Sequence, residues 1–408
     1  MTGEVGNLRI DKELANEGRF HRQELIEWWD QERLRTSRVL LIGAGALGNE
    51  ILKNLALVGV GNVLVVDMDL IEHSNLARSV LFREEDIGRP KAEVATRRAL
   101  EVFPEMHVGA LVADMVYEVG TGIFRWADVV LCGLDNREAR VAANRACQLV
   151  GRPWIDGAIE RLDGVARVFL PGTGACYECT MNDADWQALE ARRSCALLNR
   201  DQMEEGRTPT TATSSSIIAG FQCQELLKIL HAQPVDGGTG VVVNGQWNEV
   251  YKVSYPRKAD CIAHEVLEEI VDLSEGVGDV SVGQLIERAV ADLGPGTSLE
   301  LSREILSGLD CPVCGTSETI FRSLGVVNEA DARCRSCGEI RIPLLMHSVD
   351  QTWEQPDRSF AELGLPAFDL IVARNGFSAL GYLFTGDRSA ALAGLDGIDD
   401  GVEGENDG

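Results

Sequence analysis

The chain has 408 residues, 45% of them hydrophobic, with 38 Lys and Arg against 64 Asp and Glu and a formal charge of −26. This length and composition predict a sizeable core divided between two domains. The acidic balance disfavours nucleic acid as a partner, because phosphates demand clustered cations, and favours attraction of a basic protein.

The N-terminal part of the chain predicts alternating strands and helices. Residues 19–36 carry aromatic and charged residues at helical spacing, so we expect 1–36 to be a helical segment. The stretch RVLLIGAGALGNEILKNLALVGVGNVLVVDMDLIE predicts strand, glycine-rich turn, helix and strand. ADVVLCGLDN predicts another buried strand, REARVAANRACQLVG a helix, and RPWIDGAIERLDGVARVFLP two short strands.

A polar stretch, SCALLNRDQMEEGRTPTT (194–211), follows these elements and precedes a long helix expected at 213–231. It contains Gly and Pro and lacks an apolar period, so it predicts a mobile loop within a crossover segment of about 185–211. The alternation as a whole predicts an α/β fold over 37–260, with a doubly wound, Rossmann-like, mostly parallel sheet.

The composition becomes acidic near Asp260, which predicts a second domain over 261–390. SVGQLIERAVADLGPGTSLEL predicts a helix and a strand, and RSFAELGLPAFDLIVARNGFSALGYLFTGD a turn and strands. We expect a smaller α+β domain, compatible with a β-grasp-like fold that contains a zinc ribbon at 311–337. The Gly- and acid-rich end, 391–408, predicts a disordered tail.

The turn GAGALG places Gly43, Gly45 and Gly48 between a strand and a helix. Glycines let the backbone turn sharply and approach a phosphate, whose charge the helix N-terminus favours. Asp67 lies 19 residues after Gly48, at a place suited to a ribose hydroxyl. Taken alone, these residues fit NAD as well as ATP.

Polar residues after the second strand and after ADVVLCGLDN favour ATP. They are Asp69, Asn75, Arg78, Lys91 and Asp135. An Arg and a Lys beside the glycine turn suit a triphosphate, on which charge builds during reaction. Asp135 offers a carboxylate of the kind that Mg²⁺ prefers.

Eight residues have the spacing of zinc ligands. CYEC and the later DCIAHE supply the first set, and CPVCG with CRSCG supplies a second set typical of a zinc ribbon. The two sets are Cys176, Cys179, Cys261 and His264, and Cys311, Cys314, Cys334 and Cys337. Because each set fills four positions, we expect two structural Zn²⁺ sites.

Four cysteines remain. Cys132, Cys147 and Cys223 lie in predicted strands and helices and are expected to pack in the core. Cys195 lies in the polar stretch after Arg192 and Arg193, where neighbouring cations favour a thiolate. Cys195 has three interpretations: a nucleophile, a metal ligand or a thiol without a function. Metal ligation is the weakest of them, because both zinc sets are complete without Cys195.

The ordered motifs resemble the family of ATP-dependent activators of ubiquitin-like proteins, which includes the ThiF/MoeB-like adenylyltransferases and the ubiquitin-activating enzymes. The resemblance runs roughly from Arg19 to His264. It implies that Asp67 and Asp69 hold the ribose side, Asn75 orders the site, Arg78 and Lys91 neutralise phosphates, and Asp135 positions Mg²⁺. The chain departs from the family in ARS around Arg78 and in His264, where a cysteine is usual.

RFHRQ resembles the N-terminal motif of the same family, whose second Arg reaches the ATP site of a partner protomer. This implies that Arg22 acts in trans within a homodimer. The matching place of Cys195 implies covalent participation in transfer. The C-terminal domain makes the chain look like a bacterial activating enzyme that passes a ubiquitin-like protein to a conjugating enzyme, in systems linked to antiviral defence.

The predicted reaction is adenylation of the C-terminal glycine of a ubiquitin-like protein, followed by thioester formation on Cys195. Three alternatives stay open: a sulfur-carrier adenylyltransferase, a tRNA-modifying relative and a non-enzymatic zinc-ribbon adaptor. No run of about 18 apolar residues predicts a membrane span. The N-terminus has no apolar core of a signal peptide, so we expect a cytoplasmic protein with reduced cysteines.

Overall fold

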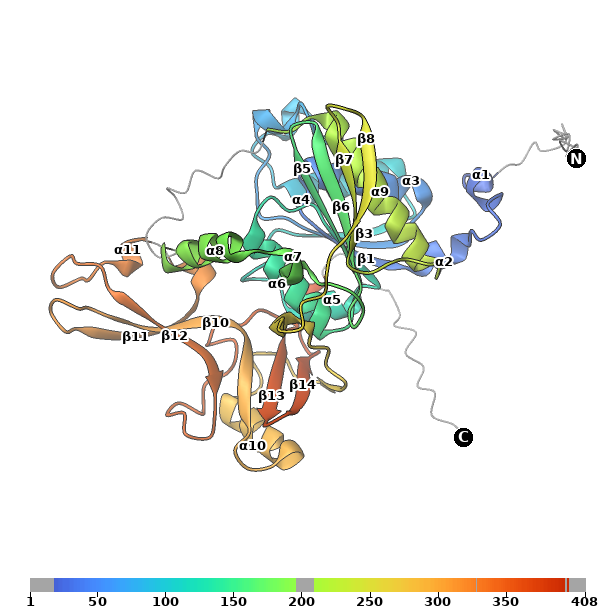
Figure 1. The fold of residues 1–408 in the computed structure, drawn as a ribbon. Helices are drawn as coiled ribbons and strands as arrows, with labels where there is room; N and C mark the ends of the chain where they lie inside the picture. Colours follow the sequence, from blue (N-terminus) through green and yellow to red (C-terminus); the bar gives the residue numbers. More distant parts are fainter. Residues whose placement is uncertain (1–17, 196–208, 328, 393–394, 396–408) are drawn as a thin grey trace, which may run out of the picture.

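The structure is a computed structural model that describes residues 18–195, 209–327, 329–392 and 395 (Figure 1). Within these residues, eight strands form one sheet in the order β3-β2-β1-β4-β5-β6-β7-β8. Their bounds are β1 Arg38–Ile42, β2 Asn62–Val66, β3 His107–Leu111, β4 Val129–Cys132, β5 Trp154–Glu160, β6 Asp163–Phe169, β7 Thr239–Asn244 and β8 Glu249–Ser254. Strands β1 to β5 are parallel and β6 to β8 antiparallel, so the predicted mostly parallel, Rossmann-like sheet is confirmed.

Both faces of the parallel part are covered, which explains why its strands are continuous apolar runs. In β1, Val39 and Leu41 face one core, while Leu40 and Ile42 face the other. The first core packs under α3 (Ala46–Val58), α4 (Lys91–Val102) and α9 (Ala212–Leu230). The second packs under α5 (Thr121–Trp126), α6 (Arg137–Leu149) and α7 (Tyr177–Thr180).

The N-terminal segment contains two short helices, α1 (His21–Glu24) and α2 (Gln31–Thr36), where the sequence predicted one. Asp30 separates them, because its carboxylate accepts a hydrogen bond from the Arg33 backbone N–H at 3.1 Å and so begins a new helix. Short 3₁₀ helices follow at η1 (His73–Asn75), η2 (Glu84–Asp86), η3 (Ile262–His264) and η4 (Leu324–Val326).

The crossover segment expected from about 185 begins as a helix and not as a loop. Helix α8 spans Asp183–Cys195, so Cys195 is its last residue. Two acids in the first turn and buried Leu189 support this helix, since carboxylates favour a helix N-terminus. The remainder of the predicted loop, 196–208, lies outside the described residues.

The C-terminal domain contains a second sheet and helices of its own. Its sheet has the order β11-β10-β13-β14-β9, with β12 also paired to β10, and only β14 and β9 are parallel within the described residues. The bounds are β9 Ile270–Leu273, α10 Val282–Leu293, β10 Ser298–Asp310, β11 Ser317–Ser323, α11 Glu329–Ala332, β12 Ile342–Val349, β13 Leu370–Asn375, β14 Ser378–Phe384 and α12 Arg388–Ala391. Its kinship with β-grasp folds stays a prediction.

The two domains share part of one core. Leu267, Phe368 and Leu370 of the C-terminal domain are buried together with residues of α5 and α6. Leu392 and Leu395 join the same cluster, although the sequence predicted a disordered tail from 391. Their apolar side chains explain the difference, because burying them stabilises a segment that composition alone assigned to the tail. Residues 396–408 lie outside the described part of the chain.

Candidate active site

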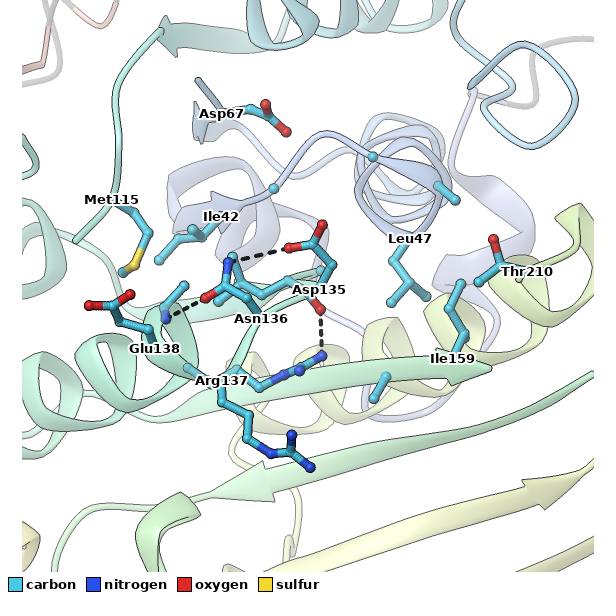
Figure 2. Close-up of a pocket in the computed structure, with 18 of the residues that line it drawn as sticks. Ile42, Leu47, Asp67, Met115, Asp135, Asn136, Arg137, Glu138, Ile159 and Thr210 are labelled. Carbon is cyan, nitrogen blue, oxygen red and sulfur yellow. Dashed lines mark hydrogen bonds between the residues drawn. The ribbon is translucent and has the colours of Figure 1, made fainter. Parts of the chain in front are cut away.

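A cavity of about 1910 Å³ opens at the carboxyl ends of β1, β2 and β4 (Figure 2). From β1 the chain builds the sheet outward on one side through β2 and β3, and then on the other side through β4 and β5. Open α/β sheets bind ligands at the point where the strand order changes direction in this way. The cavity brings together most of the predicted nucleotide-site residues. Those that line it are Gly43, Gly45, Asp67, Asp69, Asn75, Arg78, Lys91 and Asp135.

The three glycines of the turn have different roles. Gly43 has φ +92°, and a Cβ there would lie 2.7 Å from the Gly133 carbonyl oxygen. A Cβ on Gly48 would lie 1.9 Å from the Gly43 carbonyl oxygen, so Gly48 allows helix and strand to pack and does not line the cavity. Gly45 caps α3 and has no atom within 4 Å of such a Cβ. Gly45 therefore leaves the open space that a phosphate needs at a helix N-terminus.

Asp67 is fixed by the turn itself. Its carboxylate accepts hydrogen bonds from the backbone N–H groups of Ala44 at 2.7 Å and Asp69 at 2.8 Å. Burial raises the pKa of Asp67 despite these hydrogen bonds and the nearby charge of Lys91. The carboxylate thus lies at the rim of the glycine turn, after β2, as predicted.

Lys91 is the first residue of α4, and its Nζ lies 2.6 Å from the Asp69 carboxylate. Burial alone would lower the pKa of Lys91, but the charges of Asp67, Asp69 and Asp135 raise it. The side chain is therefore held as a cation inside the cavity, where it can neutralise a phosphate.

Arg78 contacts the segment that precedes α9. Its Nη1 donates to the Thr210 hydroxyl at 2.9 Å, and both residues line the cavity. Thr210 stands next to Thr211, the N-cap of α9, so the end of the crossover segment reaches the part of the cavity that Arg78 lines. No motif or spacing predicts this contact, because the two residues are 132 positions apart.

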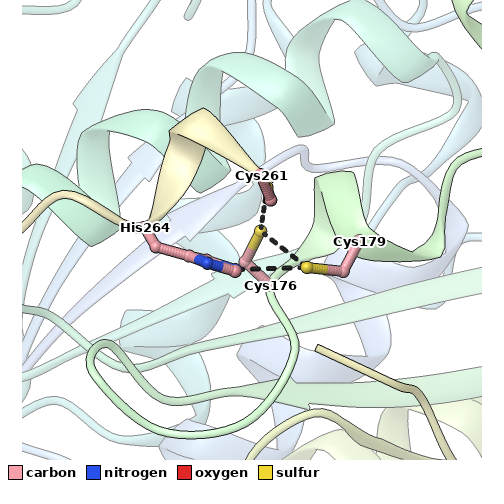
Figure 3. Close-up of side chains that lie close together, drawn as sticks. All are labelled: Cys176, Cys179, Cys261 and His264. Carbon is pink, nitrogen blue, oxygen red and sulfur yellow. Dashed lines mark hydrogen bonds between the residues drawn. The ribbon is translucent and has the colours of Figure 1, made fainter. Parts of the chain in front are cut away.

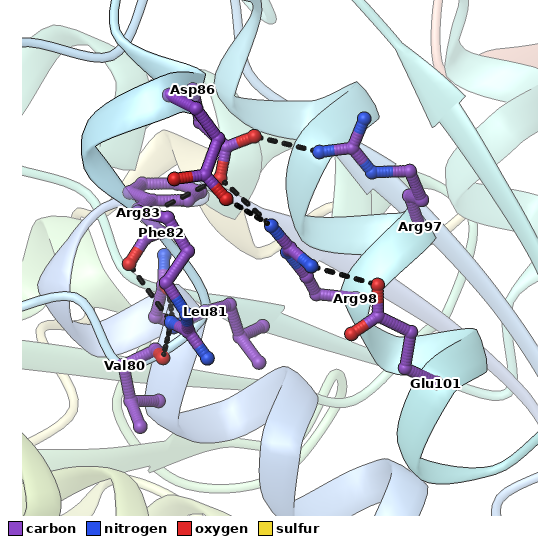
Figure 4. A network of polar contacts seen from close by, with 10 residues as sticks. Val80, Leu81, Phe82, Arg83, Asp86, Arg97, Arg98 and Glu101 are labelled. Atoms are coloured by element: carbon purple, nitrogen blue, oxygen red, sulfur yellow. Dashed lines mark hydrogen bonds and ion pairs between the residues drawn. The ribbon is translucent and has the colours of Figure 1, made fainter.

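A buried acid holds the loop between Arg78 and Lys91 in place (Figure 4). Asp86 is fully buried and accepts hydrogen bonds from the Arg83 backbone N–H at 3.0 Å, Arg97 at 2.7 Å and Arg98 at 3.4 Å. Burial would raise its pKa, but these hydrogen bonds and cations lower it. The loop that presents both cations to the cavity is thereby anchored to α4.

Asp135 follows β4 and is exposed to the cavity, one residue before Asn136, the N-cap of α6 (Figure 2). The Asn136 side chain donates to its carboxylate at 3.3 Å and caps the helix through the Ala139 N–H at 2.8 Å. An exposed carboxylate facing Lys91 and the glycine turn has the chemistry of a Mg²⁺ ligand.

The sequence missed a charged cluster in the wall of the cavity. Asp156, fully buried in β5, is shared by Arg140 at 2.9 Å and Arg167 at 3.0 Å. Burial would raise the pKa of Asp156, but the two arginines lower it. Arg140 and Arg167 line the cavity beside Tyr177, whose ring packs against Arg167. No local pattern marks these residues, because a strand, a helix and a second strand bring them together.

Two predicted catalytic residues are not brought to the cavity by the described chain. Arg22 is exposed on α1 and does not line it, so its predicted role across a dimer is untested. Cys195 ends α8, and its side chain lies outside the described part of the structure. Asp185 and Leu189 of the same helix do line the cavity, and Arg137 Nη2 lies 2.9 Å from the Asp185 carboxylate.

The first predicted zinc set converges near α7 (Figure 3). Cys176 Sγ lies 3.8 Å from Cys179 Sγ and 3.6 Å from Cys261 Sγ, and Cys179 Sγ lies 3.1 Å from His264 Nε2. A tetrahedral Zn²⁺ with bonds of about 2.3 Å separates two sulfurs by about 3.8 Å. The four ligands therefore fit a zinc ion, including His264, which departs from the family pattern.

The second set converges at the end of an arm that β10, β11 and β12 form together. Cys311 and Cys337 Sγ are 3.5 Å apart, and Cys314 and Cys334 Sγ 3.6 Å. Cys314 and Cys337 are exposed, while the other two ligands are buried. This arrangement also fits a closed four-thiolate zinc site.

Cys132, Cys147 and Cys223 are buried, as predicted. Burial raises the pKa of all three thiols, for Cys223 to about 12. A neutral buried thiol is a poor nucleophile, so these three act as packing residues.

Comparison with known proteins fits this geometry. The chain matches the ThiF family over residues 19–259, more than half of its length. The protein belongs to the ThiF family.

Curated relatives carry the names of several kinds of activating enzyme. The chain is 40% identical over 169 residues to the sulfur carrier protein adenylyltransferase of Thermus thermophilus, covering 40% of this chain and 62% of that protein. It is 39% identical over 158 residues to the SAMP-activating enzyme E1 of Haloferax volcanii, covering 38% and 57%. It is 41% identical over 160 residues to the NEDD8-activating enzyme E1 catalytic subunit of Arabidopsis thaliana, covering 35% and 34%. The chain thus spans less than two thirds of each of these relatives.

Among solved structures, E. coli MccB with ATP aligns with a TM-score of 0.50 and 22% identity, covering 61% of this chain and 75% of MccB. At that identity the likeness concerns the fold alone. In the described residues, no helix combines the length and apolar character of a membrane span.

Proposed function

We propose that this protein uses ATP to adenylate the C-terminal carboxylate of a ubiquitin-like or sulfur-carrier protein. The observation that carries the proposal is the single cavity in which a glycine turn at a helix N-terminus meets Arg78, Lys91 and Asp135. Membership of the ThiF family and relatives named adenylyltransferase or activating enzyme support it.

ATP would lie with its phosphates at Gly45 and the N-terminus of α3, and with its ribose at Asp67. Lys91 and Arg78 would neutralise the phosphate oxygens on either side of the turn. Asp135 would hold Mg²⁺, whose charge offsets that of the triphosphate. The residues that line this half of the cavity fit both groups.

The rest of the cavity has room for the end of a protein substrate. Its volume of about 1910 Å³ exceeds the roughly 300–1,000 Å³ that a small ligand fills. Beyond the nucleotide side it is lined by residues of β5, β6, β7 and β8, among them Ile159, Val165, Val242 and Tyr251. A glycine-ended tail would lie along these strands and bring its carboxylate to the α-phosphate.

In the first step, a carboxylate oxygen attacks the α-phosphorus and the bond to the bridging oxygen of pyrophosphate breaks. An acyl-adenylate forms and pyrophosphate leaves. The carboxylate is already ionised, so no general base is needed. Catalysis then consists of positioning and charge neutralisation by Lys91, Arg78 and, from a partner protomer, Arg22.

In the second step, the Cys195 thiolate attacks the acyl carbon, the bond to the adenylate oxygen breaks, and a thioester and AMP result. A conjugating enzyme would collect the product in the cytoplasm. The course of α8, whose Asp185 and Leu189 line the cavity six or more residues before Cys195, supports this role.

A sulfur-carrier adenylyltransferase is the second candidate, favoured by the relative of that name from Thermus thermophilus. It differs after adenylation, because sulfur from a persulfide and not an enzyme thiol would attack the acyl-adenylate. This attack would release AMP and form an acyl disulfide, and a second thiol would then cleave its S–S bond to give a thiocarboxylate and a new disulfide.

The first test is exchange of labelled pyrophosphate into ATP with a panel of glycine-ended ubiquitin-like and sulfur-carrier proteins. Wild-type protein should catalyse exchange with at least one of them, and Asp135→Ala should lower the rate by about 100-fold or more. Unchanged exchange in Asp135→Ala would remove the Mg²⁺ assignment. Absence of exchange with the whole panel would contradict the proposal.

The role of Cys195 is tested separately, by a gel assay for an adduct that a reducing agent cleaves. Cys195→Ala should abolish the adduct and keep pyrophosphate exchange, because the thiol acts after adenylation. Cys147→Ala is the matched control and should keep both. An adduct that survives Cys195→Ala would exclude this thiol as the acceptor.

A further inference from the structure

The segment Asp114–Gly122, here called the wall segment, lies between the cavity and the C-terminal domain. It follows β3 and leads into α5, and its residues 114–118 line the cavity. Met115 and Glu138 lie on the side of the cavity that also holds Asp67 and Ile42 (Figure 2). The wall segment therefore borders the part of the cavity assigned to the nucleoside.

A buried ion pair of the C-terminal domain, Arg303 with Asp369, contacts the backbone of the wall segment. Arg303 donates to the carbonyl oxygens of Val116 at 3.3 Å and Val119 at 3.1 Å, and to the Asp369 carboxylate at 3.4 Å. Asp369 is fully buried and accepts a hydrogen bond from the Thr121 N–H at 2.9 Å. The Arg303 side chain is only 8% exposed, so water does not substitute for these contacts.

The shape of β10 aims Arg303 at this target. The pairing of β10 with β12 shifts register between Glu300 and Ile305, and Ser302 and Arg303 lie within that irregularity. Such bulges turn side chains out of the regular alternation and are frequent near functional sites. Ser302 also donates to Asp369, so the bulge is linked to the acid that immediately precedes β13.

Glycines bring the two domains close enough for these contacts. A Cβ on Gly120 would lie 2.3 Å from the Ala367 carbonyl oxygen, and one on Gly122 2.5 Å from that of Phe368. From η4, Gly325 lines the cavity itself, and a Cβ there would lie 2.6 Å from Cβ of Tyr117. The Tyr117 hydroxyl donates to Glu138 at 3.0 Å, which continues the contact to the start of α6.

We propose that Arg303 and Asp369 are positioning residues for the nucleotide, because they fix the wall segment from the C-terminal domain. The C-terminal domain is then a structural part of the ATP site and not only a platform for partners. This inference rests on the proposed use of ATP. It adds that ATP binding depends on Arg303 and Asp369, which lie outside residues 19–259.

The test uses the full-length protein and a non-hydrolysable ATP analogue, with affinity measured by calorimetry. Arg303→Lys keeps a cation beside Asp369, but a single ammonium cannot reproduce the fork that binds two carbonyls and a carboxylate. We expect analogue affinity to fall by about tenfold, the effect of about 1.4 kcal/mol. Pyrophosphate exchange should show a raised KM for ATP with kcat nearly unchanged, as for a loss of uniform binding.

Asp272→Asn is the matched control. Asp272 on β9 pairs with Arg125 across the same domain interface but does not touch the wall segment. It should leave analogue affinity unchanged at a comparable melting temperature. Gly325→Ala supplies an independent disturbance from η4 and should also weaken analogue binding.

Wild-type affinity in both Arg303→Lys and Gly325→Ala, or an equal loss in Asp272→Asn, would overturn the inference while leaving adenylation intact. Conversely, weakened analogue binding in Arg303→Lys without adenylation of any carrier protein would support the inference and contradict the proposed function. The two failures are therefore distinguishable.

Discussion

The sheet domain and the C-terminal domain contain the same three devices, but they bury them differently. Each contributes to a four-residue set of candidate metal ligands, and each contains an acid shared by two arginines and glycines in tight turns. In the sheet domain, Cys176 and Asp156 are fully buried. In the arm, Cys314 is exposed and the Glu318 side chain is 35% exposed.

This difference indicates what each device stabilises. The first cluster joins positions 176 and 179 to 261 and 264, so it ties the sheet domain to the beginning of the C-terminal domain. The second cluster joins only the turn between β10 and β11 to the turn between α11 and β12. We infer that the buried ligand set and buried acid hold distant segments together, whereas the exposed ones stabilise only the residues around them. The loss of stability caused by substitutions in each group tests this difference.

The largest expected contrast is between the two clusters. Cys176→Ser and Cys314→Ser should each remove one zinc ion per chain. Because structural zinc contributes on the order of 10 kcal/mol to folding, Cys176→Ser should destabilise the main unfolding transition severely, whereas Cys314→Ser should unfold the arm alone. Metal analysis with scanning calorimetry measures both effects, and Cys147→Ala should retain two zinc ions.

Equal loss of melting temperature in Cys176→Ser and Cys314→Ser would break the comparison. It would mean that the arm is as strongly coupled to the main core as the first cluster.

The second contrast concerns the two shared acids. Asp156→Asn leaves Arg140 and Arg167 without a buried counter-charge and should cost about 3–5 kcal/mol of unfolding free energy. Glu318→Gln, at a partly exposed pair with Arg341 and Arg335, should cost about 1 kcal/mol or less. Urea denaturation at pH 7 compares them.

The pH dependence sharpens this contrast. The arginines hold the pKa of Asp156 below its usual 3.8 even though burial opposes them, so its ionised form stabilises the fold above that value. The loss of unfolding free energy in Asp156→Asn, relative to the wild-type protein, should therefore be constant from pH 8 to pH 5. It should shrink only as the pH falls below about 3.8. A deficit that changes between pH 8 and pH 5 would contradict the assigned direction.

The same contrast between local and distant contacts explains what the sequence could predict. The glycine turn, Asp67, Lys91 and both metal sets follow from short spacings, and the structure brings each group together. A metal site is especially predictable, since two pairs of ligands need only to meet.

Contacts between residues that lie far apart in the sequence could not be predicted from it. The cluster around Asp156 and the grip of Arg303 on the wall segment join residues that no spacing relates. Helix α8 was missed for a different reason, because its polar composition gives no strong apolar period and only Leu189 is buried among its described side chains. The role of Cys195 at its end stays a prediction.

The smallest expected contrast is between two glycines. In Gly48→Ala the new Cβ meets the Gly43 carbonyl at 1.9 Å, and neither backbone can move without displacing α3 from β1. We expect a loss of about 3 kcal/mol, at the upper end for overpacking. Gly338→Ala in the zinc ribbon adds no contact within 4 Å but has φ +76°, so strain alone should cost about 1 kcal/mol.

Gly45→Ala controls for the turn, because no atom lies within 4 Å of the new Cβ; it should keep wild-type stability and weaken binding of the ATP analogue. If Gly45→Ala instead unfolds as readily as Gly48→Ala, the turn is strained throughout, and the separation of packing at Gly48 from phosphate approach at Gly45 is wrong.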